Sequence, residues 1–252
     1  MHSILEMKQF FLYAFPAMPL ALLGLPLYVY LPTYYAQDIQ LGIFEVGSVL
    51  LVARVFDMLM DPIIGYICDL YRIHKFVLII SVVLNATGAL MLAFFSPLYS
   101  NLFLAILLIT LGEASSDTLI NTLSLDFLSR SSNQTHFGKW RLWGAIGYMA
   151  GSFSLGLFQF DIIIKLIPLL FAGANILAFC LAFFLPKTSA TKPADWLGGL
   201  KIVTQNKSFA LLLVGMVITG IAFSNIISYF TVYMNGIKAA SWMLGSGVAM
   251  QT

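Results

Sequence analysis

The sequence predicts an all-α polytopic membrane protein, with a bundle of six spanning helices followed by a seventh. The prediction rests first on composition, because 60% of the 252 residues are hydrophobic and only 10% are charged. The mean hydropathy is +0.92, whereas a soluble domain has about 45–50% apolar and about 25% charged residues. An ordinary soluble protein and a disordered chain are therefore excluded. A net charge of +2 without a basic run also excludes a nucleic-acid-binding protein.

The second observation is the length of the apolar segments, since a spanning helix needs about 20 mainly apolar residues. These segments are apolar on all sides rather than at every second residue, which favours helices over a barrel. The first is longer than the apolar core of a signal peptide, roughly 7–15 residues, so we expect it to remain in the mature chain. The seven segments are Phe10–Pro32, Ile43–Cys68, Phe76–Ser96, Leu102–Leu128, Leu142–Phe158, Ile162–Leu185 and Phe209–Tyr233.

Basic residues are distributed unequally between the two sides of this arrangement. Only Lys165 and Lys238 lie on one side, and Arg54 lies within a span. The positive-inside rule then predicts a cytoplasmic N-terminus, and we expect a multi-pass protein of a bacterial inner membrane. The basic residues of the other side are Lys8, Arg72, Lys75, Arg130, Lys139, Arg141, Lys187, Lys192, Lys201 and Lys207.

The chain divides into three parts. Residues 1–185 hold the six-helix bundle, residues 186–207 form a cytoplasmic linker that begins at Pro186, and residues 208–252 hold the seventh helix and a tail. Six helices plus one is an unusual total for a bundle. We therefore expect the last part to be the start of an incomplete C-terminal bundle.

Ionisable residues concentrate in two of the spans, although each costs at least about 2.5–3.5 kcal/mol at mid-helix. In the second span, Arg54, Asp57 and Asp61 lie at i, i+3 and i+7, on one helix face. Glu45 begins this span, where an acidic side chain favours the helix N-terminus. In the fourth span, Glu113, Asp117 and Asn121 lie at i, i+4 and i+8.

Carboxylates one turn apart in a low dielectric repel each other. Either one of them is protonated, or a cation lies between them, or Arg54 neutralises part of the charge. Each solution makes the group sensitive to protons or to a hard monovalent cation, for which carboxylate oxygens are suitable ligands. The alternative is an ion-pair network that only holds helices together. The concentration on two helices favours a transport site. The two cysteines and three histidines form no disulfide framework and no metal-ligand spacing.

The string Arg54-Val-Phe-Asp57-Met-Leu-Met-Asp61-Pro62-Ile-Ile-Gly65 resembles the signature of the glycoside–pentoside–hexuronide:cation symporters. This is the melibiose-permease-like family of the major facilitator superfamily. The continuation from Gly65 to Lys75 resembles the loop motif of the superfamily, with Ile73 or His74 at the position of its glycine. The string Phe137-Gly-Lys-Trp-Arg141 is similar to a helix start in sugar and nucleoside symporters.

The resemblance implies roles for individual residues and a bundle of two inverted three-helix repeats. Asp57 and Asp61 bind the coupling Na⁺, Li⁺ or H⁺, and Glu113 lies between the cation and the solute. Arg141 contacts the solute or closes the cavity. Residues with structural or gating roles are Arg54, Gly65, Asp69, Arg72 and Lys75, of which the last three latch one state of the carrier. Solute contacts are expected from Arg141, Asp117 and Asn121.

We therefore expect a Na⁺- or H⁺-coupled symporter of a sugar or another small organic solute, working by alternating access. It needs the lipid bilayer, a solute and a coupling ion, but no cofactor, and it is not an enzyme. The main alternative is a truncated, transport-incompetent fragment or half-carrier that requires a second chain. A seven-helix photoreceptor is disfavoured because Phe209–Tyr233 has no lysine. An intramembrane aspartyl protease is disfavoured because Asp57 and Asp61 share one helix.

Overall fold

The computed structural model describes residues 18–20, 42–96, 98–130, 137–157, 160–185 and 205–216, with isolated positions from 218 to 246. Every regular element in this part of the chain is helical, which confirms the predicted all-α class. The five long helices are α3 (Ile43–Tyr71), α4 (His74–Phe94), α5 (Tyr99–Arg130), α6 (Phe137–Leu157) and α7 (Phe160–Phe184).

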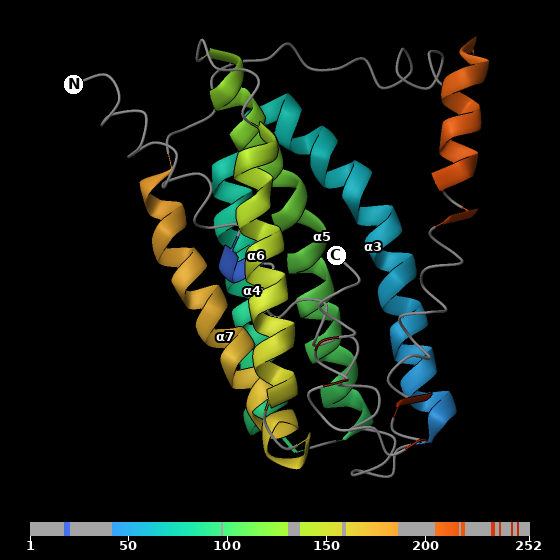
Figure 1. The fold of residues 1–252 in the computed structure, drawn as a ribbon, viewed down its shortest axis with the longest axis vertical. Helices are drawn as coiled ribbons and strands as arrows, with labels where there is room; N and C mark the ends of the chain where they lie inside the picture. The colour runs from blue at the N-terminus through green and yellow to red at the C-terminus, as the bar shows by residue number, and fades with distance from the viewer. Residues whose placement is uncertain are drawn as a thin grey trace.

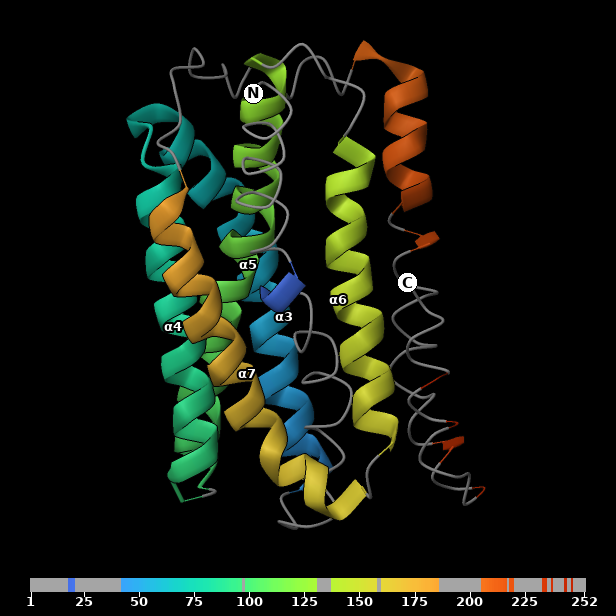
Figure 2. The same ribbon diagram turned by 60° about the vertical axis from the view of Figure 1, so that its left-hand side comes forward.

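The helices form one elongated bundle in which α5 packs against both α4 and α3. Helix α7 packs against α4, which lies at one edge of the bundle (Figures 1 and 2). Helix α6 makes a smaller interface with α5. A short apolar helix, Lys207–Met216, stands at the opposite edge of the molecule from α7 (Figures 1 and 2).

Three of the described helical stretches are long and apolar enough to cross a membrane: His74–Phe94, Tyr99–Asp126 and Leu166–Phe184. Helix α3 has 29 residues, which makes it about 44 Å long at 1.5 Å per residue. It is long enough to span, but it carries charged residues along its length. The predicted first segment lies outside the described residues except for 18–20, as does much of the seventh beyond residue 216.

The predicted helix bounds agree with the structure to within a turn, except at the start of α6. That helix begins at Phe137 rather than at Leu142. Hydropathy starts a segment where charge ends, but the helix continues through Arg141, because a long charged side chain near a helix end can extend toward the membrane surface. Arg141 accordingly lies within the helix and is exposed.

The ends of α3 are determined by local interactions. At its start, Glu45 Oε2 accepts a hydrogen bond from the Gly42 N–H at 3.1 Å, which satisfies a backbone donor that the helix leaves unpaired. Near the same end, Ser48 Oγ lies 3.2 Å from Tyr99 Oη of α5. The helix finishes at Arg72, whose φ of 58° is left-handed and stops the helix.

Glycines set the separation between α4 and α5. A Cβ at Gly88 would lie 2.6 Å from the Ala105 carbonyl oxygen, and one at Gly112 would overlap the Ser81 carbonyl oxygen and the Asn85 side chain. Lipid offers no hydrophobic drive for helix association, so close backbone approach at small residues is what holds such helices together. Gly112 thereby fixes the position of its neighbour in sequence, Glu113.

An apolar cluster joins five described segments, residues 18–20 and helices α3, α4, α5 and α7, at the end of the bundle where α3 finishes. Its aliphatic side chains are almost completely buried, so this end of the bundle is packed as a unit. The members are Leu20, Cys68, Leu78, Val82, Leu119, Ile120, Leu123, Ala178, Ala182 and Leu185.

Candidate functional site

The charged face of α3 lies at the middle of the helix. Asp57 is equally far from Ile43 and Tyr71, about 21 Å from each end at 1.5 Å per residue. Arg54 and Asp61 lie one turn to either side of it, as the predicted spacing required. Both are exposed, whereas Asp57 is partly buried. The ionisable groups therefore lie at the middle of the helix, and a charge there would be costly if α3 spans the bilayer.

Arg54 and Asp57 form an ion pair within α3. Arg54 Nη1 donates to Asp57 Oδ2 at 3.4 Å, and the side chains are 59% and 28% exposed. This is long for a charge-assisted hydrogen bond, which is typically about 2.7–2.9 Å. The Asp57 charge is therefore only loosely compensated by Arg54 in this arrangement.

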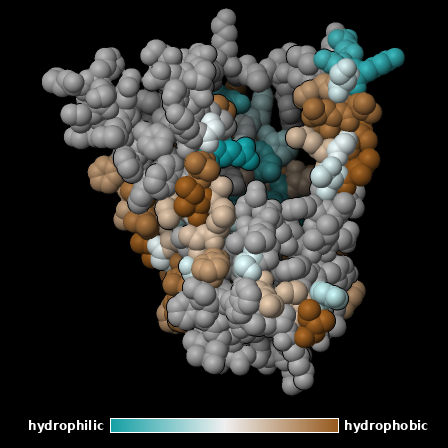
Figure 3. Space-filling model, in the orientation of Figure 1, coloured by the Kyte–Doolittle hydropathy of each residue, from teal (hydrophilic) through white to brown (hydrophobic). Residues whose placement is uncertain are grey.

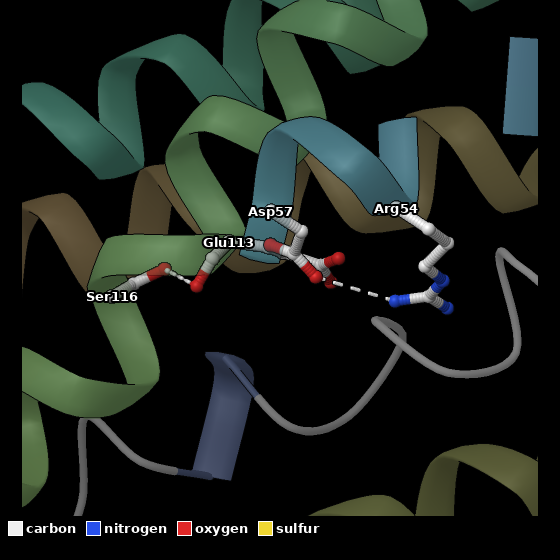
Figure 4. A network of polar contacts seen from close by, with 4 residues as sticks. All are labelled: Arg54, Asp57, Glu113 and Ser116. Carbon is white, nitrogen blue, oxygen red and sulfur yellow. Dashed lines mark hydrogen bonds and ion pairs between the residues drawn. The ribbon is translucent and has the colours of Figure 1, made fainter. Parts of the chain in front are cut away.

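A second carboxylate approaches this pair from α5. Figure 4 shows the Glu113 side chain extending from α5 toward Asp57 on α3, with Arg54 on the far side of Asp57. Ser116 lies beside Glu113 and donates from Oγ to the Gly112 carbonyl at 2.7 Å and to the Glu113 carbonyl at 3.4 Å. The structure thus brings together Arg54, Asp57 and Glu113 from two helices.

The remaining predicted solute and cation ligands are less closely grouped. Asn121 lies partly buried on α5, two turns beyond Glu113, and Asp61 is exposed on α3. The backbone of Asp117 belongs to α5, but its side chain is outside the described structure. Arg141 is on α6, whose interface with α5 is small.

The surface of the molecule is hollowed near one end. Figure 3 shows the hollow in its upper part, with hydrophilic side chains exposed there. Figure 1, in the same orientation, places the last turns of α3 and α5 at this end. The hollow therefore opens toward the end of the bundle that holds the loop between α3 and α4.

The loop between α3 and α4 and the helix ends beside it hold Asp69, Arg72 and Lys75, the residues of the expected latch. His74 Nε2 lies 2.9 Å from Asp69 Oδ1, and the His74 side chain is only 4% exposed. Lys75 Nζ instead donates to backbone carbonyls at the end of α7. Arg72 is exposed. Sequence reasoning missed the role of His74 in this loop, although its spacing of five from Asp69 across a tight turn was an available signal. The latch itself stays a prediction.

The glycine of this loop motif was expected at Ile73 or His74, and the backbone corrects that expectation. Among the described non-glycine residues, only Arg72 has a positive φ, 58°. Glycine is favoured in this left-handed region because it has no Cβ to clash with the backbone. The glycine-like position of the loop is therefore Arg72.

Arg72→Gly is expected to stabilise the protein by about 1 kcal/mol, since the left-handed conformation costs an L-residue about 1–2 kcal/mol. Thermal unfolding in detergent measures the change. Arg72→Ala is the matched control, because it removes the same charge but keeps a Cβ and should leave stability nearly unchanged. Equal stabilisation by both variants would contradict the explanation and assign the effect to charge.

A family model described as "MFS_1 like family" matches residues 5–252 of the chain. The chain belongs to the MFS_1-like family. The match covers nearly the whole sequence and shows membership of the major facilitator superfamily, which the sequence predicted. No curated protein matches the sequence.

Solved structures of transporters share the fold of this MFS_1-like chain. A crystal structure of a point mutant of the nucleoside transporter NupG has a TM-score of 0.77 at 18% identity, covering 95% of this chain and 62% of that one. A second NupG structure has a TM-score of 0.71 at 19% identity, with 94% and 62% covered. A mutant peptide transporter POT in complex with sulfate has a TM-score of 0.58 at 16% identity, with 87% and 46% covered.

These likenesses show that the MFS_1-like chain has the fold of the matching transporter structures. The chain spans about 62% of the length of the NupG structures. Together with the apolar helices, the family shows an integral multi-pass membrane protein. At below 20% identity the comparison says nothing of solute or coupling ion.

Proposed function

We propose that this chain carries the cation site and part of the solute site of a Na⁺- or H⁺-coupled symporter that works by alternating access. The proposal rests mainly on one observation: Glu113 extends from α5 toward Asp57 on α3, and Asp57 forms a long ion pair with Arg54. Two carboxylates facing each other at mid-membrane depth repel unless a positive charge is shared between them.

A coupling cation would bind Asp57 and Glu113, with Asp61 one turn farther along α3. Its binding relieves the repulsion between the carboxylates and stabilises the contact between α3 and α5. An ion changes the balance of two carrier states only by binding one of them better. The loaded carrier then exchanges between outward- and inward-facing states.

The solute is proposed to be a sugar or another small organic molecule that offers several hydroxyl groups. Asn121, Asp117 and Arg141 are the proposed contacts, since amide, carboxylate and guanidinium groups pair with hydroxyls. The resemblance to the glycoside–pentoside–hexuronide:cation symporters supports a sugar. A nucleoside is a second candidate, because the matching NupG structures are of a nucleoside transporter.

The proposed organisation is an N-terminal bundle of residues 1–185, a cytoplasmic linker of residues 186–207 and the start of a C-terminal bundle in residues 208–252. We place the N-terminus in the cytoplasm of a bacterial cell, with the protein in the inner membrane. A half-carrier that requires a second chain is one alternative to a carrier that transports by itself. Another is a transport-incompetent fragment that binds the cation without moving solute.

Reconstitution in proteoliposomes tests the proposal with the chain as it is. Uptake of labelled sugars and nucleosides is measured under an imposed Na⁺ gradient, an imposed pH gradient, or neither. Uptake driven by one of the two gradients is the expected result, and uptake that ignores both contradicts coupling.

Cation binding is measured separately by thermal unfolding. Na⁺ at ten times its Kd raises the free energy of unfolding by about 1.4 kcal/mol, and K⁺ is the control. Stabilisation by Na⁺ or acid without uptake supports the fragment alternative. Absence of both effects overturns the proposed function.

A further inference from the structure

Asn85 is a buried polar residue near the middle of α4 that belongs to neither the cation site nor the proposed solute contacts. It is 1% exposed, and its Oδ1 has no hydrogen-bond partner among the described residues. A buried acceptor without a donor lowers stability, and lipid around a spanning helix supplies no donor in its place. The presence of this amide therefore needs an explanation other than stability.

The Asn85 amide lies against Gly112 of α5. A Cβ added to Gly112 would overlap Asn85 Oδ1 and the Ser81 carbonyl oxygen, and it would lie 2.6 Å from Asn85 Cγ. The amide oxygen is therefore next to the backbone of Gly112. Contacts between a Cα–H group and an oxygen recur where helices approach closely, and they are weakly favourable. The absence of a side chain at Gly112 is what allows this contact.

A second close contact lies one turn from Asn85 and restricts how α5 is rotated against α4. A Cβ added to Gly88 of α4 would lie 2.6 Å from the Ala105 carbonyl oxygen and 2.8 Å from Ile109 Cγ1 of α5. One contact uses a glycine of α5 and the other a glycine of α4. A rotation of α5 about its own axis would disturb both contacts, so together they favour the observed rotation.

The rotation of α5 determines the direction of Glu113. Because Gly112 and Glu113 are consecutive, their directions differ by about 100° around a helix of 3.6 residues per turn. Gly112 is buried against α4, whereas Glu113 is half-buried and extends toward Asp57 of α3 (Figure 4). A rotation that moved Gly112 away from Asn85 would therefore also turn Glu113 away from Asp57.

A buried asparagine can select one arrangement of helices at a cost in stability. In coiled coils, a single asparagine in the core fixes the register of the helices in this way. Asn85 is placed to act similarly, since its oxygen has a contact on α5 in the observed rotation. An aliphatic side chain would be less selective, because apolar contacts are not directional.

We propose that Asn85 is a positioning residue that sets the rotation of α5 and thereby directs Glu113 toward Asp57. Groups behind the ligands of a metal ion orient those ligands, and their replacement typically lowers metal affinity about 10–100-fold. Asn85 has this place relative to the carboxylates, although it touches neither of them. The effect on Glu113 follows from the packing alone, whereas the effect on ion binding rests on the proposed function.

Cross-linking tests the direction of Glu113 without requiring an ion. Asp57→Cys and Glu113→Cys are combined in one chain, and the rate at which a short bifunctional thiol reagent joins them is measured. The exposed Cys180 is replaced by Ala, and Cys68 is left because it is buried. Asn85→Ala in this background is expected to lower the cross-linking rate several-fold.

Asn85→Ser is a second variant that gives the same comparison if Asn85→Ala does not fold. The shorter side chain does not reach Gly112, and its hydroxyl can bond within α4. Ser81 already does so, since its Oγ donates to the Val77 carbonyl at 2.8 Å. The cross-linking rate should again fall several-fold.

Asn175→Ala is the matched control. Asn175 of α7 is also 1% exposed, and its Oδ1 likewise has no hydrogen-bond partner among the described residues. Helix α7 packs mainly against α4, so the control removes the same atoms from a buried place outside the α4–α5 contact. The cross-linking rate should stay at the value of the parent.

Thermal unfolding of the chain with Asp57 and Glu113 intact tests the consequence for ion binding, with K⁺ as the control ion. In Asn85→Ala, the Na⁺ concentration that gives half of the stabilisation should rise about tenfold. If acid stabilises the parent instead, the midpoint should move to lower pH by about one unit. Asn175→Ala should keep the midpoint of the parent, because a residue that only supports the fold changes the unfolding temperature and not the midpoint.

Three results would overturn the proposal: an unchanged cross-linking rate in the Asn85 variants, equal slowing in Asn175→Ala, or an unchanged midpoint in Asn85→Ala when the parent responds to an ion. A parent that responds to neither Na⁺ nor acid contradicts the proposed function instead. The cross-linking rates then still decide whether Asn85 directs Glu113, since they do not depend on ion binding.

Discussion

Asp57→Asn is expected to reduce ion-driven uptake to the level of empty vesicles, the largest functional effect of any single substitution proposed for this chain. Asparagine keeps the shape of the side chain but removes the negative charge that a cation needs opposite Glu113. It also removes the partner of Arg54, whose pair with Asp57 is 3.4 Å long. Uptake driven by a Na⁺ or pH gradient in proteoliposomes measures the effect.

Glu45→Gln is the matched control for this substitution. Glu45 is a carboxylate on the same helix, but it is exposed at the helix start, where its Oε2 accepts from Gly42 N–H. Glutamine preserves that hydrogen bond, so the control should keep gradient-driven uptake and thermal stability. Normal coupled uptake in Asp57→Asn, or equal loss in both variants, would contradict a cation site at Asp57.

Gly112→Leu is expected to give the largest loss of stability, about 3 kcal/mol or more, because overpacking of a close interface already costs typically 1–3 kcal/mol. Even a Cβ at this position would overlap the Ser81 carbonyl oxygen and the Asn85 amide. The backbone oxygen cannot turn away, so α4 and α5 have to separate. We expect aggregated protein on size-exclusion chromatography and a lowered unfolding temperature.

Gly173→Ala is the control for a helical glycine in an open position. A Cβ at Gly173 on α7 would have no atom within 4 Å, and alanine favours a helix over glycine by about 0.8–1.0 kcal/mol. This variant should be as stable as the parent protein or slightly more stable. If Gly112→Leu unfolds at the same temperature as Gly173→Ala, the close α4–α5 approach is wrong.

Helix geometry made the charged face of α3 predictable. The positions of Arg54, Asp57 and Asp61 on one face follow from 3.6 residues per turn, and no neighbouring helix is needed to derive them. The approach of Glu113 to Asp57 was expected only from the family resemblance. Spacing within the sequence could not supply it, because it depends on how α5 rotates against α3.

Contacts between the ends of different helices could not be predicted from the sequence. The resemblance to the superfamily's loop motif implies that Asp69, Arg72 and Lys75 act together. In the folded chain, a left-handed residue at Arg72 ends α3 and places His74 beside Asp69. Lys75 then points to carbonyls more than a hundred residues away, at Phe183 and Leu185.

The sequence alone determined the all-helical class, the apolar spans, the charged face of α3 and the superfamily. Each of these depends on composition, helix periodicity or a short sequence motif. Which residues meet across helices depended on packing: Glu113 with Asp57, Lys75 with α7, and Gly112 against Ser81. The physical reason is that lipid does not drive helices together, so close backbone approach and a few polar contacts determine their rotation and register. The spacing of residues within one segment determines neither the rotation nor the register of the helices.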